Sequence, residues 1–249
     1  MADLTILYTG DLHGKLTPTK VERIRGEKAT CGECLLLDSG DAVSSGNVYY
    51  RPGGEPILAH MSDAGYDAMT LGNREFHFLS AGLKSKVSLA RFPVLCANLR
   101  CKNSSREPSV IPSVRLEVSG LQVALFGLTV PMITPGMLAS KVSPYWFESP
   151  VESAKSVVPT LRDSADLVIA LTHIGIKADM ELAAQVSGID LIVGGHTHVT
   201  PTEPVVVGAT SIAHAGWWGH YLGRVEMTRT ASGWQASTQL IDLRAGGGR

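Results

Sequence analysis

Short runs of consecutive hydrophobic residues recur along the chain, each bounded by Gly, Asp or Asn. Continuous runs of this length are typical of β-strands covered on both faces, because a half-exposed strand alternates polar and apolar positions. Six such strands are predicted, at residues 4–8, 35–37, 68–71, 94–96, 166–171 and 191–193. Between them, hydrophobic residues at helical spacing predict helices at residues 56–64, 80–90, 150–164 and 177–187. This alternation favours an α/β core with right-handed crossovers.

Two further stretches have the pattern of antiparallel hairpins. They are residues 113–118 and 122–126 around Ser119-Gly120, and residues 221–228 and 235–243 around Ala231-Ser232-Gly233. The hairpins predict a second, mainly antiparallel sheet packed on the first. No internal repeat and no long linker divides the chain, so residues 1–249 are predicted to form a single domain.

Composition excludes some classes of partner. With 249 residues, 44% of them hydrophobic, the chain can bury a sizeable core. Its formal net charge of −1 and dispersed basic residues give no signature of nucleic-acid or membrane binding. No signal-peptide pattern and no run of 18 apolar residues occurs. A cytoplasmic protein is therefore expected, unless a signal peptide has been removed.

The four cysteines leave two interpretations open. Cys31 and Cys34 have the spacing of half a zinc knuckle or a redox pair, with Cys96 and Cys101 as the only other half. That second gap is wider than zinc knuckles prefer. We favour the alternative, in which Cys34 and Cys96 are small apolar residues that border buried strands in a reducing compartment.

Five polar clusters stand where predicted strands end. They contain two aspartates, one asparagine and four histidines: Asp11, His13, Asp41, Asn73, His173, His196 and His198. Since ligands of open α/β sheets bind beyond the carboxyl ends of the strands, these side chains are expected to converge. A lone Asp or His at such a place is usually a cap or a core residue, but seven together predict a centre of two divalent ions. The mixture of O and N donors suits Mn, which we favour, and also Zn, Fe, Co or Ni.

The spacing leaves the distribution of these ligands between two ions open. Residues two apart in an extended segment point the same way, which lets Asp11 and His13 share one ion. His196 and His198 either share an ion in the same manner or are directed to different ions by a turn at residues 194–195.

The chain resembles the calcineurin-like metallophosphoesterases, and among them the catalytic domain of the 5′-nucleotidases. The likeness is carried by LLDSGD (36–41), GYDAMTLGN (65–73), TH (172–173), GGHTH (194–198) and GHYLG (219–223). It implies an α/β fold, a four-layer α/β/β/α sandwich of two mixed sheets. It also implies one ion held by Asp11, His13, Asp41 and His198, and a second held by Asp41, Asn73, His173 and His196, with Asp41 bridging.

The resemblance implies a hydrolase whose two ions clamp phosphate oxygens for in-line displacement. The expected substrate is a small phosphate-bearing molecule, an ester or anhydride, with a nucleotide favoured. The alternatives are a phosphodiesterase, or a metal-dependent phospholigand-binding protein with weak turnover. Nothing in the sequence corresponds to the C-terminal domain through which two-domain 5′-nucleotidases bind the nucleoside.

One segment departs from the family pattern. After the Asn the family normally has a His, and its nucleotidase branch an Asp three residues later, where this chain has Arg74 and His77. Arginine stays charged and cannot donate a proton at neutral pH, but its planar fork can grip phosphoryl oxygens. Either His77, His214 or His220 protonates the leaving group, or the enzyme depends on good leaving groups. Asn73, Arg74 and His77 are therefore the candidate catalytic residues.

Substrate contacts are expected from Arg74, from His220 and from the pair Trp217 and Trp218. The two tryptophans can stack on a base or aryl group, or pack in the core of a hairpin. Residues 49–51, Tyr-Tyr-Arg, could form a second rim, but we expect an ordinary exposed loop there.

Overall fold

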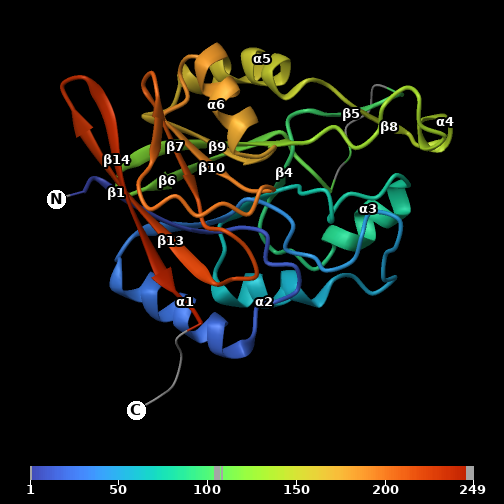
Figure 1. Cartoon of the computed structure of the whole chain (residues 1–249), viewed down its shortest axis with the longest axis horizontal. Coiled ribbons are helices and arrows are strands. Elements are labelled where there is room, and N and C mark those ends of the chain that lie inside the picture. The colour runs from blue at the N-terminus through green and yellow to red at the C-terminus, as the bar shows by residue number, and fades with distance from the viewer. Residues whose placement is uncertain (1, 104–106, 108, 245–249) are drawn as a thin grey trace.

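In the computed structural model the chain forms two β-sheets packed face to face, with helices on both outer sides (Figure 1). The structure describes residues 2–103, 107 and 109–244. The first sheet consists, in spatial order, of β14 (Gly233–Asp242), β13 (Tyr221–Thr230), β1 (Leu4–Thr9), β2 (Cys34–Asp38), β3 (Ala68–Thr70) and β4 (Val94–Leu95). The second consists of β11 (Val205–Val207), β12 (Thr210–His214), β10 (Leu191–Gly194), β9 (Leu167–His173), β7 (Leu121–Thr129) and β6 (Ser113–Val118).

Helices complete the outer layers. On the first sheet lie α1 (Pro18–Thr30), α2 (Pro56–Ala64) and α3 (Ser80–Val87), and on the second lie α5 (Pro150–Arg162) and α6 (Ile176–Gln185). A small ribbon of β5 (Leu99–Cys101) and β8 (Tyr145–Phe147) extends to one side with α4 (Ala139–Val142). The predicted α/β/β/α sandwich of two mixed sheets is therefore confirmed.

Successive residues of the central strands point into different apolar layers. In β1, Ile6 lies between the sheets, while Leu7 packs under the helices of the first sheet. In β9, Ile169 lies between the sheets, while Ala170 packs under the helices of the second. Both faces of these strands are covered, which explains their continuous hydrophobic runs.

The predicted second sheet of mainly antiparallel strands is wrong, because the two hairpins join different sheets. Hairpin β13–β14 extends the first sheet through an antiparallel pairing with β1, whereas β7 of the other hairpin pairs in parallel with β9. Each sheet consequently has three parallel and two antiparallel strand pairings among the described residues. A hairpin pattern determines how its two strands pair with each other and leaves their outer partners undetermined.

Helix α1 and strands β11 and β12 were not predicted. Most residues of α1 are polar or charged, and only Val21 and Ile24 are buried. Its sequence therefore shows little hydrophobic periodicity. Its start has ordinary signals, since Thr17 accepts a hydrogen bond from the Lys20 amide at 3.3 Å and proline follows it.

The cysteine interpretation that we favoured is confirmed for Cys34 and Cys96, which are buried apolar residues of the layer between the first sheet and its helices. All four thiols are free. In the part of the chain that the structure describes, no helix is long and apolar enough to cross a membrane. The cytoplasmic location stays a prediction.

The layer between the sheets should dominate stability. Ile169→Ala removes a fully buried side chain from this layer and is expected to lower the free energy of unfolding by about 2–5 kcal/mol. Val206→Ala, at a position that is 62% exposed on β11, is the matched control and should cost less than about 0.5 kcal/mol. Urea unfolding followed by circular dichroism measures both, and equal losses would contradict the assignment of the core.

Candidate metal centre

Loops that follow five parallel strands meet at one edge of the molecule. Strands β1, β2 and β3 of the first sheet and β9 and β10 of the second end there. The loops and strand ends bring together all seven predicted ligands: Asp11, His13, Asp41, Asn73, His173, His196 and His198. The expected convergence at the carboxyl ends of strands is thus what the structure shows.

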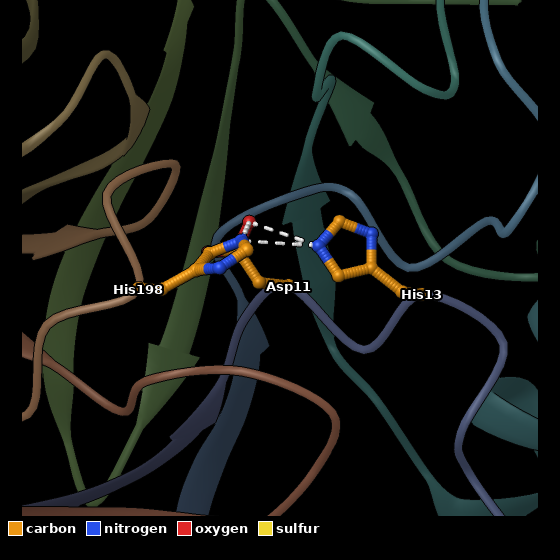
Figure 2. A group of neighbouring side chains, drawn as sticks. All are labelled: Asp11, His13 and His198. Atoms are coloured by element: carbon orange, nitrogen blue, oxygen red, sulfur yellow. Dashed lines mark hydrogen bonds and ion pairs between the residues drawn. The ribbon is translucent and has the colours of Figure 1, made fainter.

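The first group consists of Asp11, His13 and His198, and Figure 2 shows their polar atoms turned toward one another. The Nε2 atoms of the two histidines are 3.1 Å apart, and Asp11 Oδ1 lies 3.2 Å from that of His198 and 3.6 Å from that of His13. Donor atoms on one ion have such spacings when each metal–nitrogen bond is about 2.0–2.1 Å. Asp11 Oδ1 is buried and accepts no hydrogen bond from the described residues. A buried oxygen without a hydrogen bond is expected where its partner is a metal ion.

The second group gathers around Asn73. Its Oδ1 lies 3.1 Å from His173 Nε2 and 3.1 Å from His196 Nδ1, and His173 Nε2 lies 3.4 Å from Asp41 Oδ1. The other nitrogen of His173 donates to the Ser39 carbonyl at 2.8 Å, which directs Nε2 toward the group. His196 and His198 therefore lie in different groups, which was one of the two alternatives. The bridging role of Asp41 stays a prediction.

The electrostatics of the two groups favour a cation. Burial alone lowers the pKa of His173, but the hydrogen bond and charge of Asp41 outweigh it and raise this pKa to about 9. Burial lowers the pKa of His13 and so favours the neutral imidazole that binds metals. Burial raises the pKa of Asp41, but its contacts with His173 and the Arg74 amide hold it below the ordinary value. The Asp41 carboxylate therefore stays charged and attracts positive charge.

The backbone is strained at most of these ligands. Five of the seven have positive φ angles: Asp11 (50°), His13 (46°), Asp41 (58°), His196 (80°) and His198 (57°). Elsewhere among the described non-glycine residues only Ser119 and Trp218 share this conformation. It costs on the order of 1–3 kcal/mol per residue and persists where function or surrounding structure requires it. Its concentration here marks the site independently of the ligand chemistry.

Glu75 is a residue of the site that the sequence analysis missed. Its buried carboxylate accepts hydrogen bonds from the amides of Gly72 (2.9 Å), Asp41 (2.9 Å) and Val43 (2.8 Å), and so ties together the loops that carry Asp41 and Asn73. Burial, followed by the charge of Asp41, raises its pKa to about 7. The sequence feature that could have identified Glu75 is its position two residues after Asn73, in a polar segment at the end of a strand.

A second missed feature is the buried triad of Thr172, Asp179 and His214. The His214 Nε2 lies 2.8 Å from Asp179 Oδ2, and the Thr172 hydroxyl donates to Asp179 Oδ1 at 2.6 Å. All three are buried, and they join α6 to the ends of β9 and β12. This pairing holds His214 in the interior, so the structure does not bring it to the ligand groups.

Arg74 lies beside Asp41. Its amide donates to Asp41 Oδ1 at 2.8 Å, its Nε lies 3.5 Å from Asp41 Oδ2, and its Nη1 donates to the Ser44 carbonyl at 2.7 Å. The side chain is 37% exposed, so it is partly open to solvent beside Asp41. The structure thus brings Arg74 to the ligands.

His77 is placed differently. Its side chain is buried, Nδ1 accepts the Leu79 amide at 3.0 Å, and Nε2 lies 3.2 Å from the Val48 carbonyl, to which it donates. With both nitrogens engaged in the fold, the structure does not bring His77 to the ligand groups.

The aromatic candidates adjoin the first group. The ring of Trp217 stacks on that of His198 with centroids 5.6 Å apart and planes inclined by 19°. The Trp218 amide donates to the Asp11 carbonyl at 2.8 Å, and its ring is 45% exposed. His220 lies 5.6 Å from Trp217, centroid to centroid. The loop that carries these rings is fixed to the loop that carries Asp11.

The sequence profile of the calcineurin-like phosphoesterases matches residues 4–200, and the chain belongs to this family. It is 34% identical over 269 residues to the trifunctional nucleotide phosphoesterase protein YfkN of Bacillus subtilis (strain 168), covering 90% of this chain and 18% of that protein. It is 29% identical to a 5′-nucleotidase of Vibrio cholerae, covering 90% and 48%. The 5′-nucleotidase precursor of Thermus thermophilus has a similar structure, with a TM-score of 0.78 at 26% identity over 98% of this chain and 55% of that one.

These comparisons confirm the predicted family and the phosphoesterase class, a class of hydrolases that implies divalent metal ions. The chain spans 18% to 55% of the length of the relatives named above, so their full activities belong to larger proteins.

The role of Glu75 can be tested through metal affinity. Glu75→Gln keeps the shape of the side chain but turns an NH₂ group toward amide donors, which should loosen both loops and weaken metal binding by about 10–100-fold. Titration calorimetry of Mn into metal-free protein measures this. Glu22→Gln, at a side chain that is 71% exposed, is the matched control. A folded Glu75→Gln variant with wild-type affinity would remove Glu75 from the site.

Proposed function

We propose that this protein is a phosphoric ester hydrolase with two divalent ions, acting on a small phosphate ester or anhydride, with a nucleotide as the favoured substrate. The observation that carries the proposal is the convergence of seven O and N donor side chains at one edge of the sandwich, five of them on strained backbone. Asp11, His13 and His198 would hold one ion, and Asn73, His173 and His196 the other, with Asp41 between the two groups.

Bound divalent ions supply Lewis acidity toward phosphoryl oxygens and lower the pKa of water. We propose manganese, because the candidate ligands are carboxylate, amide and imidazole groups without a thiolate. Zn, Fe, Co and Ni are the alternatives for the same donor set.

The chain's own residues bind and orient the phosphate. The guanidinium of Arg74 carries a permanent charge and a planar donor edge beside Asp41, suited to phosphoryl oxygens. Asn73 turns its carbonyl oxygen toward His173 and His196, so its NH₂ group is available to donate to a phosphoryl oxygen. Both interactions stabilise negative charge that develops during displacement.

No proton donor is placed at the leaving group by the described contacts of His77 and His214, which are engaged in the fold. His220 adjoins Trp217 and Trp218, and burial, followed by the charges of Arg244 and Lys20, lowers its pKa, which favours the neutral ring. We therefore propose that substrates with good leaving groups are preferred. Trp217, Trp218 and His220 are the proposed contacts for a planar part of the substrate.

The relatives support a nucleotide substrate, since they are named a nucleotide phosphoesterase and 5′-nucleotidases. A phosphodiesterase is the second candidate. It is favoured by Arg74 itself, because an arginine in place of a proton donor penalises monoesters of poor leaving groups most.

Metal dependence tests the proposal. Metal-stripped protein should not hydrolyse p-nitrophenyl phosphate or its bis ester, and Mn should restore turnover, with Zn, Co, Ni and Mg tested singly. Asp41→Asn should lower the restored rate by more than about 100-fold, because ligands contribute at least as much as their outer partners. Asp63→Asn, at a side chain that is 60% exposed, is the control. Two bound ions without turnover of either ester would indicate a binding protein instead.

The leaving group tests the role of Arg74. Without a positioned acid, kcat/KM should fall steeply as leaving-group pKa rises from aryl to alkyl phosphates. Arg74→His supplies a ring that can carry a proton, and general acid help of about 10²–10⁴-fold should then flatten the dependence. A flat dependence in the unaltered protein would show that another group already donates the proton.

A further inference from the structure

Residues 44–50, here named the rim loop, begin three residues after Asp41. Ser44 lies beside the loop of the first group, since a Cβ placed on Gly14 would lie 3.0 Å from that of Ser44. The rim loop is therefore next to both Asp41 and His13 at its start.

Three side chains from outside the rim loop hold its backbone. Arg74 donates to the Ser44 carbonyl at 2.7 Å, and His77 donates to the Val48 carbonyl at 3.2 Å. Lys86 of α3 donates to the Gly46 carbonyl at 2.8 Å and to the Ser45 hydroxyl at 3.1 Å. Four of the first five residues of the rim loop, Ser44, Ser45, Gly46 and Val48, are thus bound from outside.

The holding residues are themselves fixed. Lys86 is fully buried and also donates to the Arg74 carbonyl, so it joins the rim loop to the segment that begins with Asn73. A lysine ammonium is expensive to bury unless its donors are satisfied, and here all three have acceptors. His77 is 2% exposed, stacks on Phe78 with centroids 4.9 Å apart, and meets the ring of Tyr50 edge-on at 4.9 Å.

The rim loop nevertheless exposes large side chains. Val48 is 76% and Tyr49 is 60% exposed. Apolar surface held rigid beside a polar site can bind a ligand at a lower entropic cost than a mobile loop, because its backbone is already ordered. An aromatic ring such as Tyr49 suits a planar partner.

We propose that Arg74, His77 and Lys86 are positioning residues that fix the rim loop, so that Val48 and Tyr49 contact the aryl or nucleobase part of the substrate beyond its phosphate. His77 then acts through the carbonyl of Val48 and not as a proton donor. The substrate part of this inference rests on the proposed function, whereas the holding of the loop does not.

Two variants at one position separate an anchor from an acid. His77→Gln keeps an N–H donor for the Val48 carbonyl but cannot transfer a proton at neutral pH, and His77→Leu removes the donor. If His77 anchors the rim loop, His77→Leu should raise KM for p-nitrophenyl phosphate about tenfold, the effect typical of one lost hydrogen bond, and change kcat little. His77→Gln should have the KM of the unaltered protein. If Gln lowers kcat as much as Leu, and most on alkyl phosphates, His77 is an acid and the inference is overturned.

Hydrogen exchange tests the holding of the loop without measuring turnover, so its result does not depend on the proposed function. A second variant is used if the first does not fold. Hydrogen exchange should be faster at the amides of residues 44–50 in His77→Leu, or in Lys86→Met if the former does not fold, and unchanged in His77→Gln. If a folded variant without the donor, His77→Leu or Lys86→Met, shows unchanged exchange, the inference that these side chains hold the rim loop is overturned. Faster exchange without hydrolysis of any ester would leave the holding supported and the proposed function wrong.

The contact with substrate is tested at the surface. Tyr49→Ala should raise KM for p-nitrophenyl phosphate several-fold and leave KM for acetyl phosphate, which has no ring, unchanged. Trp146→Ala, at an aromatic residue of β8 that is 43% exposed, is the matched control and should change neither value. Equal KM values for Tyr49→Ala and the unaltered protein on the aryl ester would overturn the substrate contact.

Discussion

The apolar layer between the two sheets controls the geometry of the metal centre, because the ligands come from loops and strand ends of both sheets. Leu4, Ile6, Leu35, Leu37, Ile169, Leu171, Leu191 and Val193 fill this layer, and all are nearly inaccessible to solvent. Burial of each of these side chains contributes about 1.5–3 kcal/mol to the stability of the folded state. Close-packed interiors are hard to compress, so the layer holds the strand ends at a fixed separation. Donor spacings of 3.1–3.6 Å between residues as distant in sequence as Asp11 and His198 depend on that rigidity.

Local hydrogen bonds must offset the strain at the ligands. Five positive φ angles at about 1 kcal/mol or more each amount to a large part of the 5–15 kcal/mol by which a native protein is stable. The strained segments are joined to each other, since the Asp11 amide donates to the Gly40 carbonyl and the His13 amide to the Asp41 carbonyl, both at 2.9 Å. Glu75 adds three further bonds from the buried side. A centre built in this way is preorganised before any ion or substrate binds.

The sequence predicted the candidate ligands better than their arrangement. The rule that ligands bind beyond the carboxyl ends of strands found all seven, because each stands at or just after the end of a continuous apolar run. It left open whether His196 and His198 share an ion. The rule that residues two apart point the same way holds for extended backbone and does not apply to them, because both have positive φ. Glu75 and Lys86 gave no periodic signal, since a buried charge in a loop or a charged helix resembles a solvated one until its partners are known. The hairpins were found, but their sheets depended on long-range pairing with β1 and β9.

In the segment from Asn73 to His77, the departure from the family pattern places a permanent charge among residues that are otherwise held by the fold. Asn73 faces the ligands, Glu75 holds two loops, and Phe76 packs its ring against Phe147 at 5.0 Å, so these three positions keep the segment in place. Arg74 then sets a permanent positive charge 3.5 Å from Asp41 Oδ2. Unit charges about 4 Å apart interact by about 4 kcal/mol at an effective dielectric of 20, which is enough to matter for either partner. That charge opposes a cation at Asp41 and attracts a phosphoryl dianion at the same place. A proton-donating His could be neutral in one step and charged in the next, whereas Arg74 stays charged throughout, which is why we propose it as a phosphate-binding residue that gives no help to the leaving group.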